Sequence, residues 1–379
     1  MKTSFLRKLI PYKLALSYRG TFGQKLKYLH FAKMAERHNV VASRIQRLAD
    51  EYTEDWYGIQ DVSPSDKEWL CEKGYAPRKV RWYGLTKDNY TNYLSDYVFY
   101  RPDTYMDYSF LQLFEHKLNT FLMLAPFKEF MPIHYYYKRR GAYLPIGGNK
   151  IPYDGIMGLL REKPLAAKSC RGGHGLGFYK FHFDSGDYYM NNQRVAVDEI
   201  EKTLEKLDDY IFTEYTEPHH LFKDICGPDA FPPVIRCITI YDKTDGAQLT
   251  SSVIRLGSSE GGLITDYHGT IYCGIKIETG EMFKPIWREN DLIFKQISVH
   301  PDTKVPLDGV RIPEWQQLKD LILQISAYLP WTPYLVTDII LAENGPRILE
   351  INSHGQARNC EAHYPFCLNK YQRRQFKIQ

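Results

Sequence analysis

Two segments of the sequence, far apart along the chain, carry side chains suited to holding phosphate and metal. Lys168 precedes a glycine run, Gly172-Gly173-His174-Gly175-Leu176-Gly177, and far downstream stand Asp338 and Glu350-Ile351-Asn352. Backbone N–H groups of a glycine-rich turn can converge on an anion, and a nearby lysine adds positive charge. Carboxylate and amide oxygens suit a hard divalent cation. Together the two segments indicate a protein that uses Mg-ATP.

The candidate metal ligands must be held by a β-hairpin. Residues 334–341 and 347–351 both have the composition of strands, and the Asn-Gly pair between them is a strong hairpin signal. Alternation along the second strand places Glu350 and Asn352 on one face, about 7 Å apart at the usual rise per residue.

The length of the hairpin loop decides where Asp338 lies. A three-residue loop over 343–345, with glycine in the left-handed conformation, sets Asp338 opposite Glu350, whereas a two-residue loop sends it to the other face. We expect the three-residue loop, because it brings together Asp338, Glu350 and Asn352 as oxygen ligands for Mg²⁺. An exposed hairpin with ordinary acidic residues is the alternative.

The glycine run is predicted to be a hairpin loop. One strand ends at Lys168 and the next begins at 178. Two other phosphate loops are excluded by residue order: a P-loop has Gly-Lys-Ser/Thr directly before a helix, and protein kinases place their lysine after the glycines. A flexible turn without a ligand is the alternative. The glycines that would face phosphate are Gly172, Gly173, Gly175 and Gly177.

Between these segments, residues 210–220 form an apolar strand that ends in acidic residues. Such a strand could pass along an adenine, with backbone hydrogen bonds to the base and an acid for the ribose hydroxyls. On its own it is equally an ordinary strand end.

The order of lysine–glycine loop, acidic segment and terminal Asp…Glu-x-Asn resembles the ATP-grasp superfamily. Residues from about 97 to 354 resemble more specifically the sugar-transfer-associated ATP-grasp family, which is related to the teichuronopeptide-biosynthesis type. Besides the Lys168 loop and the Asp338 end, the resembling stretches are 115–118, 233–236, 253–257, 300–303 and 309–315.

The resemblance implies an α+β fold in which two subdomains clasp ATP between antiparallel sheets. It implies a catalytic region over 101–379, with a glycine-loop subdomain at about 155–215 and a metal-binding core at about 216–379. Residues 1–100 would form a separate, basic, largely helical region.

The resemblance also assigns roles to single residues. Lys117 and Lys168 would contact phosphates, and Asp338, Glu350 and Asn352 would bind magnesium. The adenine and ribose would meet Glu214, Tyr215 and Glu217, while Arg236 and Arg255 would face the reacting phosphate or acyl group. Two strand arginines paired with carboxylates are the alternative for the last two.

Two departures from the family pattern concern the substrate side of the site. Val336 stands where many superfamily ligases have an arginine, two positions before the first metal aspartate. Asp266-Tyr267-His268-Gly269 replaces the Asp-Asn and Gly-Gly pattern expected after the second arginine.

The implied chemistry is carboxylate–amine ligation. A substrate carboxylate would attack the γ-phosphate of ATP to give an acyl phosphate, and an amine would then displace phosphate to form an amide. Such transfer depends mostly on positioning and electrostatics. The family points to cell-surface polysaccharide synthesis. Alternatives are an ATP-grasp kinase for a sugar or polyol hydroxyl and a non-catalytic nucleotide-binding accessory of glycosyltransferases.

Composition predicts a globular chain outside the membrane. The 379 residues are 44% hydrophobic, yet no apolar run reaches the length of a membrane span, and the start is a poor signal peptide, so we expect a cytoplasmic protein. Residues 1–50 hold 11 Lys and Arg against two acidic residues. Their helix is expected to pack on the catalytic body, with contact to an anionic membrane or an acidic polymer as the alternative. No recognised nucleic-acid motif accompanies the charge.

The seven cysteines are odd in number and scattered, unlike a disulfide framework. Cys360, His363 and Cys367 have a spacing that could bind zinc, with only His354 as a nearby fourth ligand, and we expect buried thiols instead. Cys170 has no adjacent base in the sequence, so no nucleophilic role is expected for it.

Overall fold

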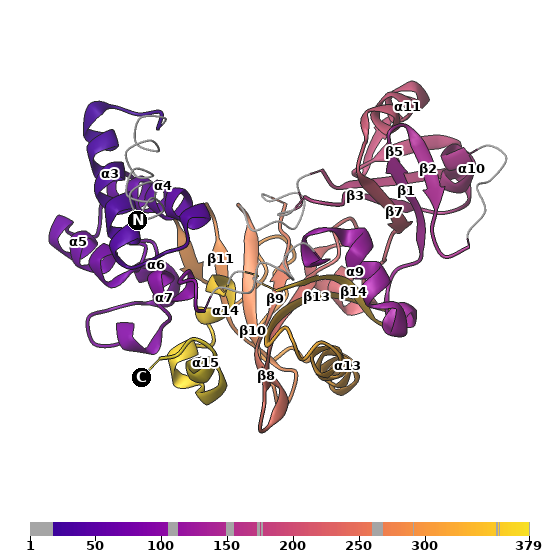
Figure 1. Cartoon of the computed structure of the whole chain (residues 1–379). Helices are drawn as coiled ribbons and strands as arrows, with labels where there is room; N and C mark the ends of the chain where they lie inside the picture. The colour runs from indigo at the N-terminus through magenta and orange to yellow at the C-terminus, as the bar shows by residue number, and fades with distance from the viewer. Residues whose placement is uncertain are drawn as a thin grey trace, which may run out of the picture.

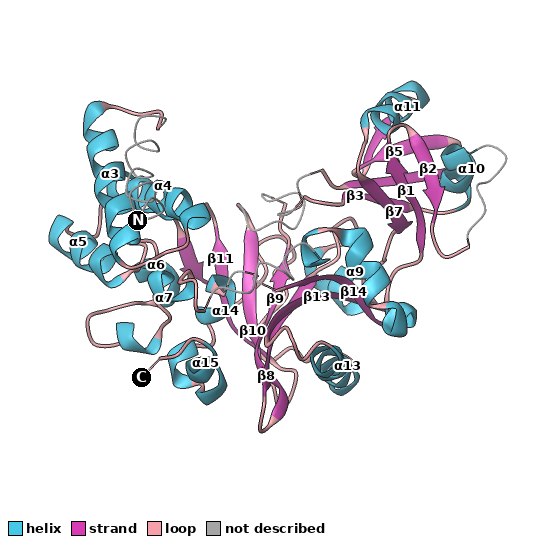
Figure 2. Cartoon of the chain, in the orientation of Figure 1, coloured by secondary structure: helices cyan, strands magenta, loops and turns pink. Residues whose placement is uncertain are grey.

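The computed structural model describes residues 18–104, 113–148, 155–172, 175, 177–259, 268–290, 292–353, 355 and 357–378. The described chain contains two seven-stranded sheets, both antiparallel at every pairing, together with helices (Figures 1 and 2). The expected α+β architecture with two antiparallel sheets is therefore confirmed. In Figure 1 the second sheet lies between the first sheet and the N-terminal helices.

The first sheet carries the glycine loop and has the strand order β2-β1-β7-β3-β4-β5-β6. Its apolar face is covered by α10 (Gly155–Glu162) and α11 (Val197–Lys206), whose Leu160, Ile200 and Leu204 are buried against Phe212. The i, i+4 spacing of Ile200 and Leu204 gives α11 the single apolar stripe that this packing needs. The strands are β1 (His134–Arg139), β2 (Ala142–Pro145), β3 (Leu165–Ser169), β4 (Tyr179–Asp184), β5 (Asp187–Met190), β6 (Gln193–Val195) and β7 (Tyr210–Glu214). The sheet thus begins at His134, before the start at 155 expected for this subdomain.

The second sheet has the order β12-β11-β10-β9-β8-β13-β14 and is covered on both faces. On one face α13 (Trp315–Tyr328) buries Leu318 and Ile322 against Ile235 and Ile339. Central strands covered twice are apolar throughout, which explains why every residue of β13 is buried. The strands are β8 (Val234–Asp242), β9 (Gly246–Leu256), β10 (Thr270–Ile275), β11 (Met282–Arg288), β12 (Phe294–Gln296), β13 (Tyr334–Ala342) and β14 (Gly345–Asn352).

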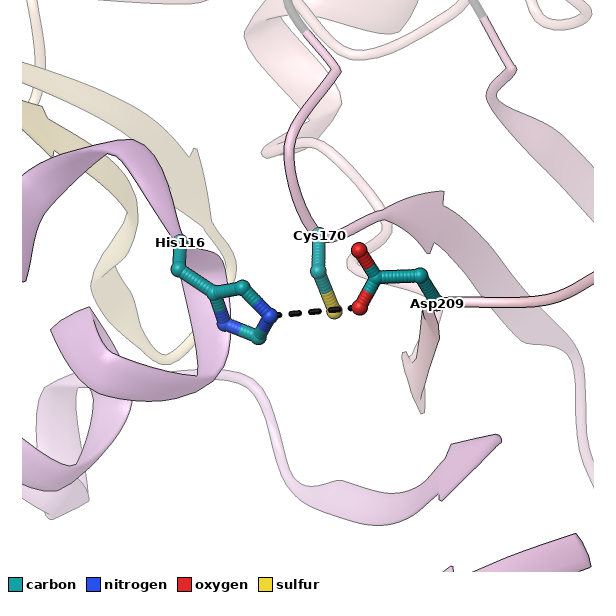
Figure 3. Close-up of side chains that lie close together, drawn as sticks. All are labelled: His116, Cys170 and Asp209. Atoms are coloured by element: carbon teal, nitrogen blue, oxygen red, sulfur yellow. Dashed lines mark hydrogen bonds and ion pairs between the residues drawn. The ribbon is translucent and has the colours of Figure 1, made fainter. Parts of the chain in front are cut away.

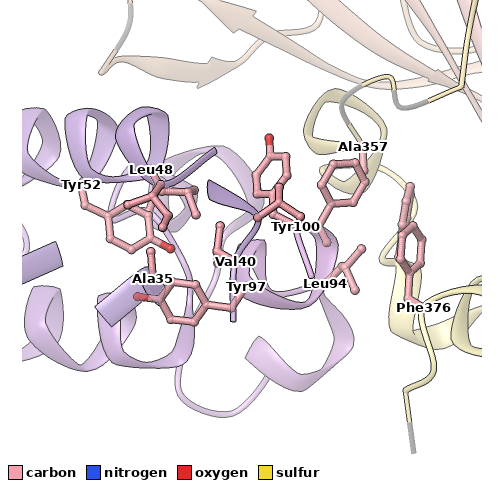
Figure 4. Packing of buried hydrophobic residues seen from close by; sticks show 14 of the residues in the cluster. Ala35, Val40, Leu48, Tyr52, Leu94, Tyr97, Tyr100, Ala357 and Phe376 are labelled. Carbon is pink, nitrogen blue, oxygen red and sulfur yellow. The ribbon is translucent and has the colours of Figure 1, made fainter. Parts of the chain in front are cut away.

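The N-terminal helices cover the other face of the second sheet. Phe31 and Tyr52 share one buried cluster with Ile238 and Val336 of the sheet and with Phe376 near the C-terminus (Figure 4). The helices are α3 (Phe22–Arg37), α4 (Ala42–Gly58), α5 (Pro64–Lys73), α6 (Lys79–Tyr83) and α7 (Asp96–Phe99), and the C-terminal helices beside them are α14 (Arg358–Glu361) and α15 (Lys370–Gln375). The favoured expectation for the basic helix was packing on the rest of the chain, and residues 22–58 do pack on the second sheet.

Buried charges join this helical region to the C-terminal segment. The guanidinium of Arg358 donates to both carboxylate oxygens of Glu51, at 2.9 and 2.8 Å. The backbone N–H of Leu94 donates to the side chain of Glu361. Shorter helices complete the described chain: α9 (Lys117–Met123) and α12 (His220–Cys226), with 3₁₀ turns at Tyr90–Asn92, Ala125–Phe130 and Phe366–Leu368.

The hairpin of β13 and β14 has the expected register, but its loop does not have the expected length. Asp338 pairs with Glu350, as predicted. The loop, however, has two residues, because Ala342 pairs directly with Gly345. The expectation of a three-residue loop was wrong. A bulge at Leu349, between the pairs Asp338–Glu350 and Ile339–Ile348, adds the one residue that restores the register.

Candidate functional site

The two sheets meet at a pocket lined by three of the predicted charged residues. Lys168 comes from β3, Glu350 from β14, and Lys117 from the first position of α9. Thr213 of β7 lines the same pocket. The structure therefore brings together residues that are far apart in sequence, at the edge where the first sheet faces the second.

Lys168 has a strongly lowered pKa in this pocket. Burial lowers the pKa of its ammonium to about 8, and the positive charge of Lys117 lowers it further, while Glu350 acts in the opposite direction. A positive charge nearby disfavours the protonated form of Lys168, and an anion bound between the two lysines would relieve the repulsion. The arrangement is suited to an anionic ligand.

Lys117 is tied directly to the glycine loop. Its ammonium donates to the carbonyl of Gly172 at 2.6 Å, and its backbone N–H donates to the carbonyl of Cys170 at 2.9 Å. The loop then turns with left-handed conformations at Gly175 (φ 71°) and Gly177 (φ 72°). A Cβ atom at Gly177 would lie 2.5 Å from the hydroxyl of Tyr210, so glycine is required there for space as well as for conformation. Gly173 lies outside the described residues.

The predicted adenine and ribose residues follow Thr213 along the chain and have contacts of their own. Glu214 accepts a hydrogen bond from the N–H of Ile133 at 3.3 Å. Tyr215 is buried with the ammonium of Lys180 over its ring, 4.3 Å from the centroid. Glu217 is exposed and forms an ion pair with Lys223 at 3.3 Å.

The two predicted arginines both bind Asp338. Arg236 on β8 lies opposite Asp338 in the sheet and donates to both its oxygens at 2.8 Å. Arg255 on β9 donates to the second of these oxygens at 3.2 Å. All three side chains are buried. A metal ion at Asp338 must therefore compete with two guanidinium groups, whereas Glu350 faces the pocket; Asn352, opposite Val336, ends the strand partly buried.

A cluster that the sequence did not reveal lies behind the two lysines. His116, Cys170 and Asp209 place their side chains together, with the imidazole Nε2 3.2 Å from a carboxylate oxygen of Asp209 (Figure 3). Cys170 does have a base nearby in the folded protein, contrary to expectation, because the fold brings His116 next to it. Burial and the neighbouring Asp209 nevertheless raise the pKa of the Cys170 thiol to about 12, which opposes a nucleophilic role.

All seven cysteines are buried and free, as expected. Cys360, His363 and Cys367 do not form a metal-ligand group among the described residues, and the Nε2 of His363 instead lies 2.9 Å from the carbonyl of Lys284. His354, the suggested fourth ligand, is outside the described residues.

Comparison with known proteins gives one family and many remote structural matches. A family model for sugar-transfer associated ATP-grasp proteins matches residues 158–365. A search of curated proteins gives no match.

Three of the solved structures to which the chain is similar are ligases by their descriptions, and one of the three is described as an ATP-grasp ligase. An L-amino acid ligase from Bacillus licheniformis has a TM-score of 0.38 and 13% identity, over 71% of this chain and 50% of that one. A Chryseobacterium gregarium RiPP-associated ATP-grasp ligase, in complex with ADP and a leader and core peptide, has a TM-score of 0.36 and 14% identity. The match covers 73% of this chain and 62% of that one. A D-alanine–D-alanine ligase from Bacillus anthracis complexed with ATP has a TM-score of 0.33 and 12% identity. The match covers 64% of this chain and 55% of that one. The chain thus spans about half the length of the first of these.

Proposed function

Because this chain belongs to the sugar-transfer associated ATP-grasp family, we propose that it is an ATP-dependent carboxylate–amine ligase. It would form an amide through an acyl-phosphate intermediate, in the assembly or modification of a cell-surface polysaccharide. The observation that carries the proposal is the pocket that Lys117, Lys168 and Glu350 line together between the two sheets.

The pocket has positively charged side chains that could bind the phosphate chain of ATP. The ammonium group of Lys117, bonded to the carbonyl of Gly172, and that of Lys168 both belong to residues that line the pocket, and each would contact the phosphate chain. Backbone N–H groups around Gly172, Gly175 and Gly177 would supply neutral donors. A triphosphate bound there would stabilise the protonated form of Lys168, which burial disfavours.

The buried arginines suit the second half of the reaction. Attack of the substrate carboxylate on the γ-phosphate breaks the bond to ADP and forms the acyl phosphate; attack of the amine then releases phosphate and a proton. Arg236 and Arg255, held by Asp338, would steady the negative charge on the reacting acyl oxygen. Their ion pairs orient both groups before any substrate binds.

The residues present fit a hard divalent cation in part. Glu350 offers a carboxylate at the pocket, Asn352 follows on the same strand, and Asp338 lies opposite Glu350 but is engaged by arginine. Mg²⁺ held by these oxygens would neutralise phosphate charge. Release of one guanidinium from Asp338 would accompany binding of the ion.

The family, and no particular residue of the site, suggests the substrates that we propose. The carboxylate would be a uronic acid or other acidic glycan component, and the amine would be an amino acid or similar small molecule. None of the described helices has the length and apolarity needed to cross a membrane. Contact of the basic N-terminal region with a membrane or a polysaccharide assembly remains part of the proposal.

Thermal melting tests nucleotide binding first. Wild type and Lys168→Ala are melted with ADP or a non-hydrolysable ATP analogue, with and without Mg²⁺. A ligand that binds only the folded state raises the melting temperature, so wild type should show a magnesium-dependent rise that the variant lacks. No shift at millimolar nucleotide contradicts an ATP site.

Phosphate release then tests the reaction. Pairs of acids and amines are screened with wild type and Glu350→Gln, a change that keeps the size of the side chain and removes its charge. Turnover should require both substrates and be lost in Glu350→Gln, although the variant melts as wild type does. ATP consumption with a sugar or polyol alone would identify a kinase, and full activity of Glu350→Gln would exclude Glu350 as a metal ligand.

A further inference from the structure

We propose that His116, Cys170 and Asp209 form a binding site for a zinc-class transition metal, separate from the nucleotide pocket. A bound ion would join the segment that carries Lys117 to the strand that carries Lys168. This proposal does not rest on the proposed ligase activity.

The types and positions of the three side chains match such an ion. An imidazole, a thiolate and a carboxylate are the usual protein ligands of Zn²⁺, and three of them leave one position for water. The ligand atoms of His116, Cys170 and Asp209 all lie within 4.8 Å of one another. The Nε2 of His116 and the Oδ1 of Asp209 are 3.2 Å apart, close to the roughly 3.4 Å that tetrahedral bonds to zinc require. Figure 3 shows the sulfur of Cys170 beside the line joining them.

The backbone holds these ligands in place before any ion binds. Asp209 has a left-handed conformation, φ 59°, which is uncommon for a residue other than glycine. In this conformation its carbonyl accepts from the N–H of Cys170 at 2.8 Å, and the carbonyl of Cys170 accepts from the N–H of Lys117 at 2.9 Å. Three separate segments are thus fixed around one point.

The surroundings resemble the second layer of a metal site. The hydroxyl of Tyr137 donates to Asp209 at 2.9 Å, and the guanidinium of Arg171 donates to its other oxygen at 3.2 Å. Hydrogen bonds of this kind orient carboxylate ligands. His116 is 9% exposed, and its Nδ1 is buried without a hydrogen-bond partner among the described residues. Its ring is therefore placed by the Nε2 side, which faces Asp209 and Cys170.

A second group of potential ligands is less suited to an ion. His219, His220 and Glu343 also come within reach of one another, but His220 and Glu343 are exposed and lie on the surface. This group has no thiol, so a spectroscopic signal from sulfur separates the two sites.

Cobalt titration of the full-length, chelator-treated protein tests the proposal. Co²⁺ replaces Zn²⁺ in tetrahedral sites and gives a thiolate-to-cobalt charge-transfer band when cysteine is a ligand. Wild type should develop this band up to one equivalent. Cys170→Ser should lose it, while Cys226→Ser, a change at another buried free cysteine, should keep it. Cys367→Ser should also keep it, which tests the Cys360–Cys367 spacing directly.

Two further variants cover the case in which Cys170→Ser does not fold. His116→Asn and Asp209→Asn leave the thiol in place and should weaken cobalt binding at least tenfold, with melting curves recorded for each. A missing band in wild type, a band that survives all three ligand changes, or a band lost in Cys367→Ser would each overturn the proposal. Because cobalt binding is measured without nucleotide, none of these outcomes bears on the ligase reaction.

Discussion

The ammonium group of Lys168 has a pKa only slightly above neutral pH in the free protein. Its pKa of about 8 results from burial and from the charge of Lys117, with Glu350 acting in the opposite direction. A group of this kind is protonated at neutral pH and loses its proton just above it. The charge of this pocket therefore changes between about pH 7 and 9, which a fully exposed lysine would not give.

Nucleotide affinity should fall as pH rises through 8. The lowered pKa means that Lys168 becomes neutral above that value, so bound phosphate loses a charged partner, and affinity declines by up to about tenfold per pH unit. Isothermal titration of ADP between pH 7 and 9.5 measures this. Lys168→Arg retains its charge over the whole range, and its affinity should change much less. Equal pH dependence in both proteins would show that Lys168 does not contact the nucleotide.

At the level of elements, the sequence predicted the strands better than their connections. Alternation and turn residues located β13, β14 and the hairpin around the glycine loop. The register of Asp338 was correct only because a bulge at Leu349 compensates a shorter loop, and a bulge depends on packing that no local pattern records. The cluster around Cys170 was missed for the same reason, since His116 and Asp209 meet it only through tertiary structure.

Two glycines allow the energetic cost of a left-handed backbone to be separated from that of a steric clash. Gly177 and Gly186 both have positive φ, 72° and 92°, but only a Cβ at Gly177 meets another atom, the Tyr210 hydroxyl at 2.5 Å. Alanine at either site costs about 1 kcal/mol for the left-handed backbone. Gly177→Ala should cost about 1–3 kcal/mol more through the clash and also weaken ADP binding. Urea unfolding and titration of both variants check this, and equal losses would mean that Tyr210 moves aside freely.

At the scale of the whole molecule, the N-terminal helices pack on the second sheet. Their buried residues share a cluster with the second sheet and with Phe376. Glu51 is buried between Arg358 and Arg78; although burial disfavours its charge, these guanidinium groups, Arg358 foremost, lower its pKa to about 2. The ion pair of Glu51 with Arg358 attaches the described part of residues 1–100 to the C-terminal segment.

Removal of the Glu51 charge should destabilise the entire protein. Glu51→Gln removes the charge that faces the buried guanidinium of Arg358, whereas Arg78 keeps its pairs with Asp55 and Glu54. Breaking a buried ion pair on one side costs about 3 to 5 kcal/mol. Urea unfolding at pH 7 should show this as a single cooperative transition at lower denaturant. The difference from wild type should shrink as pH falls from 4.5 through 2, where Glu51 takes up its proton. Glu281→Gln, at the more exposed pair with Lys276, is the control and should change little.

The same pairing of Glu51 with Arg358 has a consequence for how the protein is made. The two residues are 307 positions apart, so a ribosome adding 5 to 20 residues per second needs about 15 to 60 s to supply the second after the first. The strands that cover α3 and α4 are also made late, because β8 and β13 begin only at Val234 and Tyr334. Until these strands emerge, the apolar faces of the two helices are exposed in the newborn chain and open to aggregation.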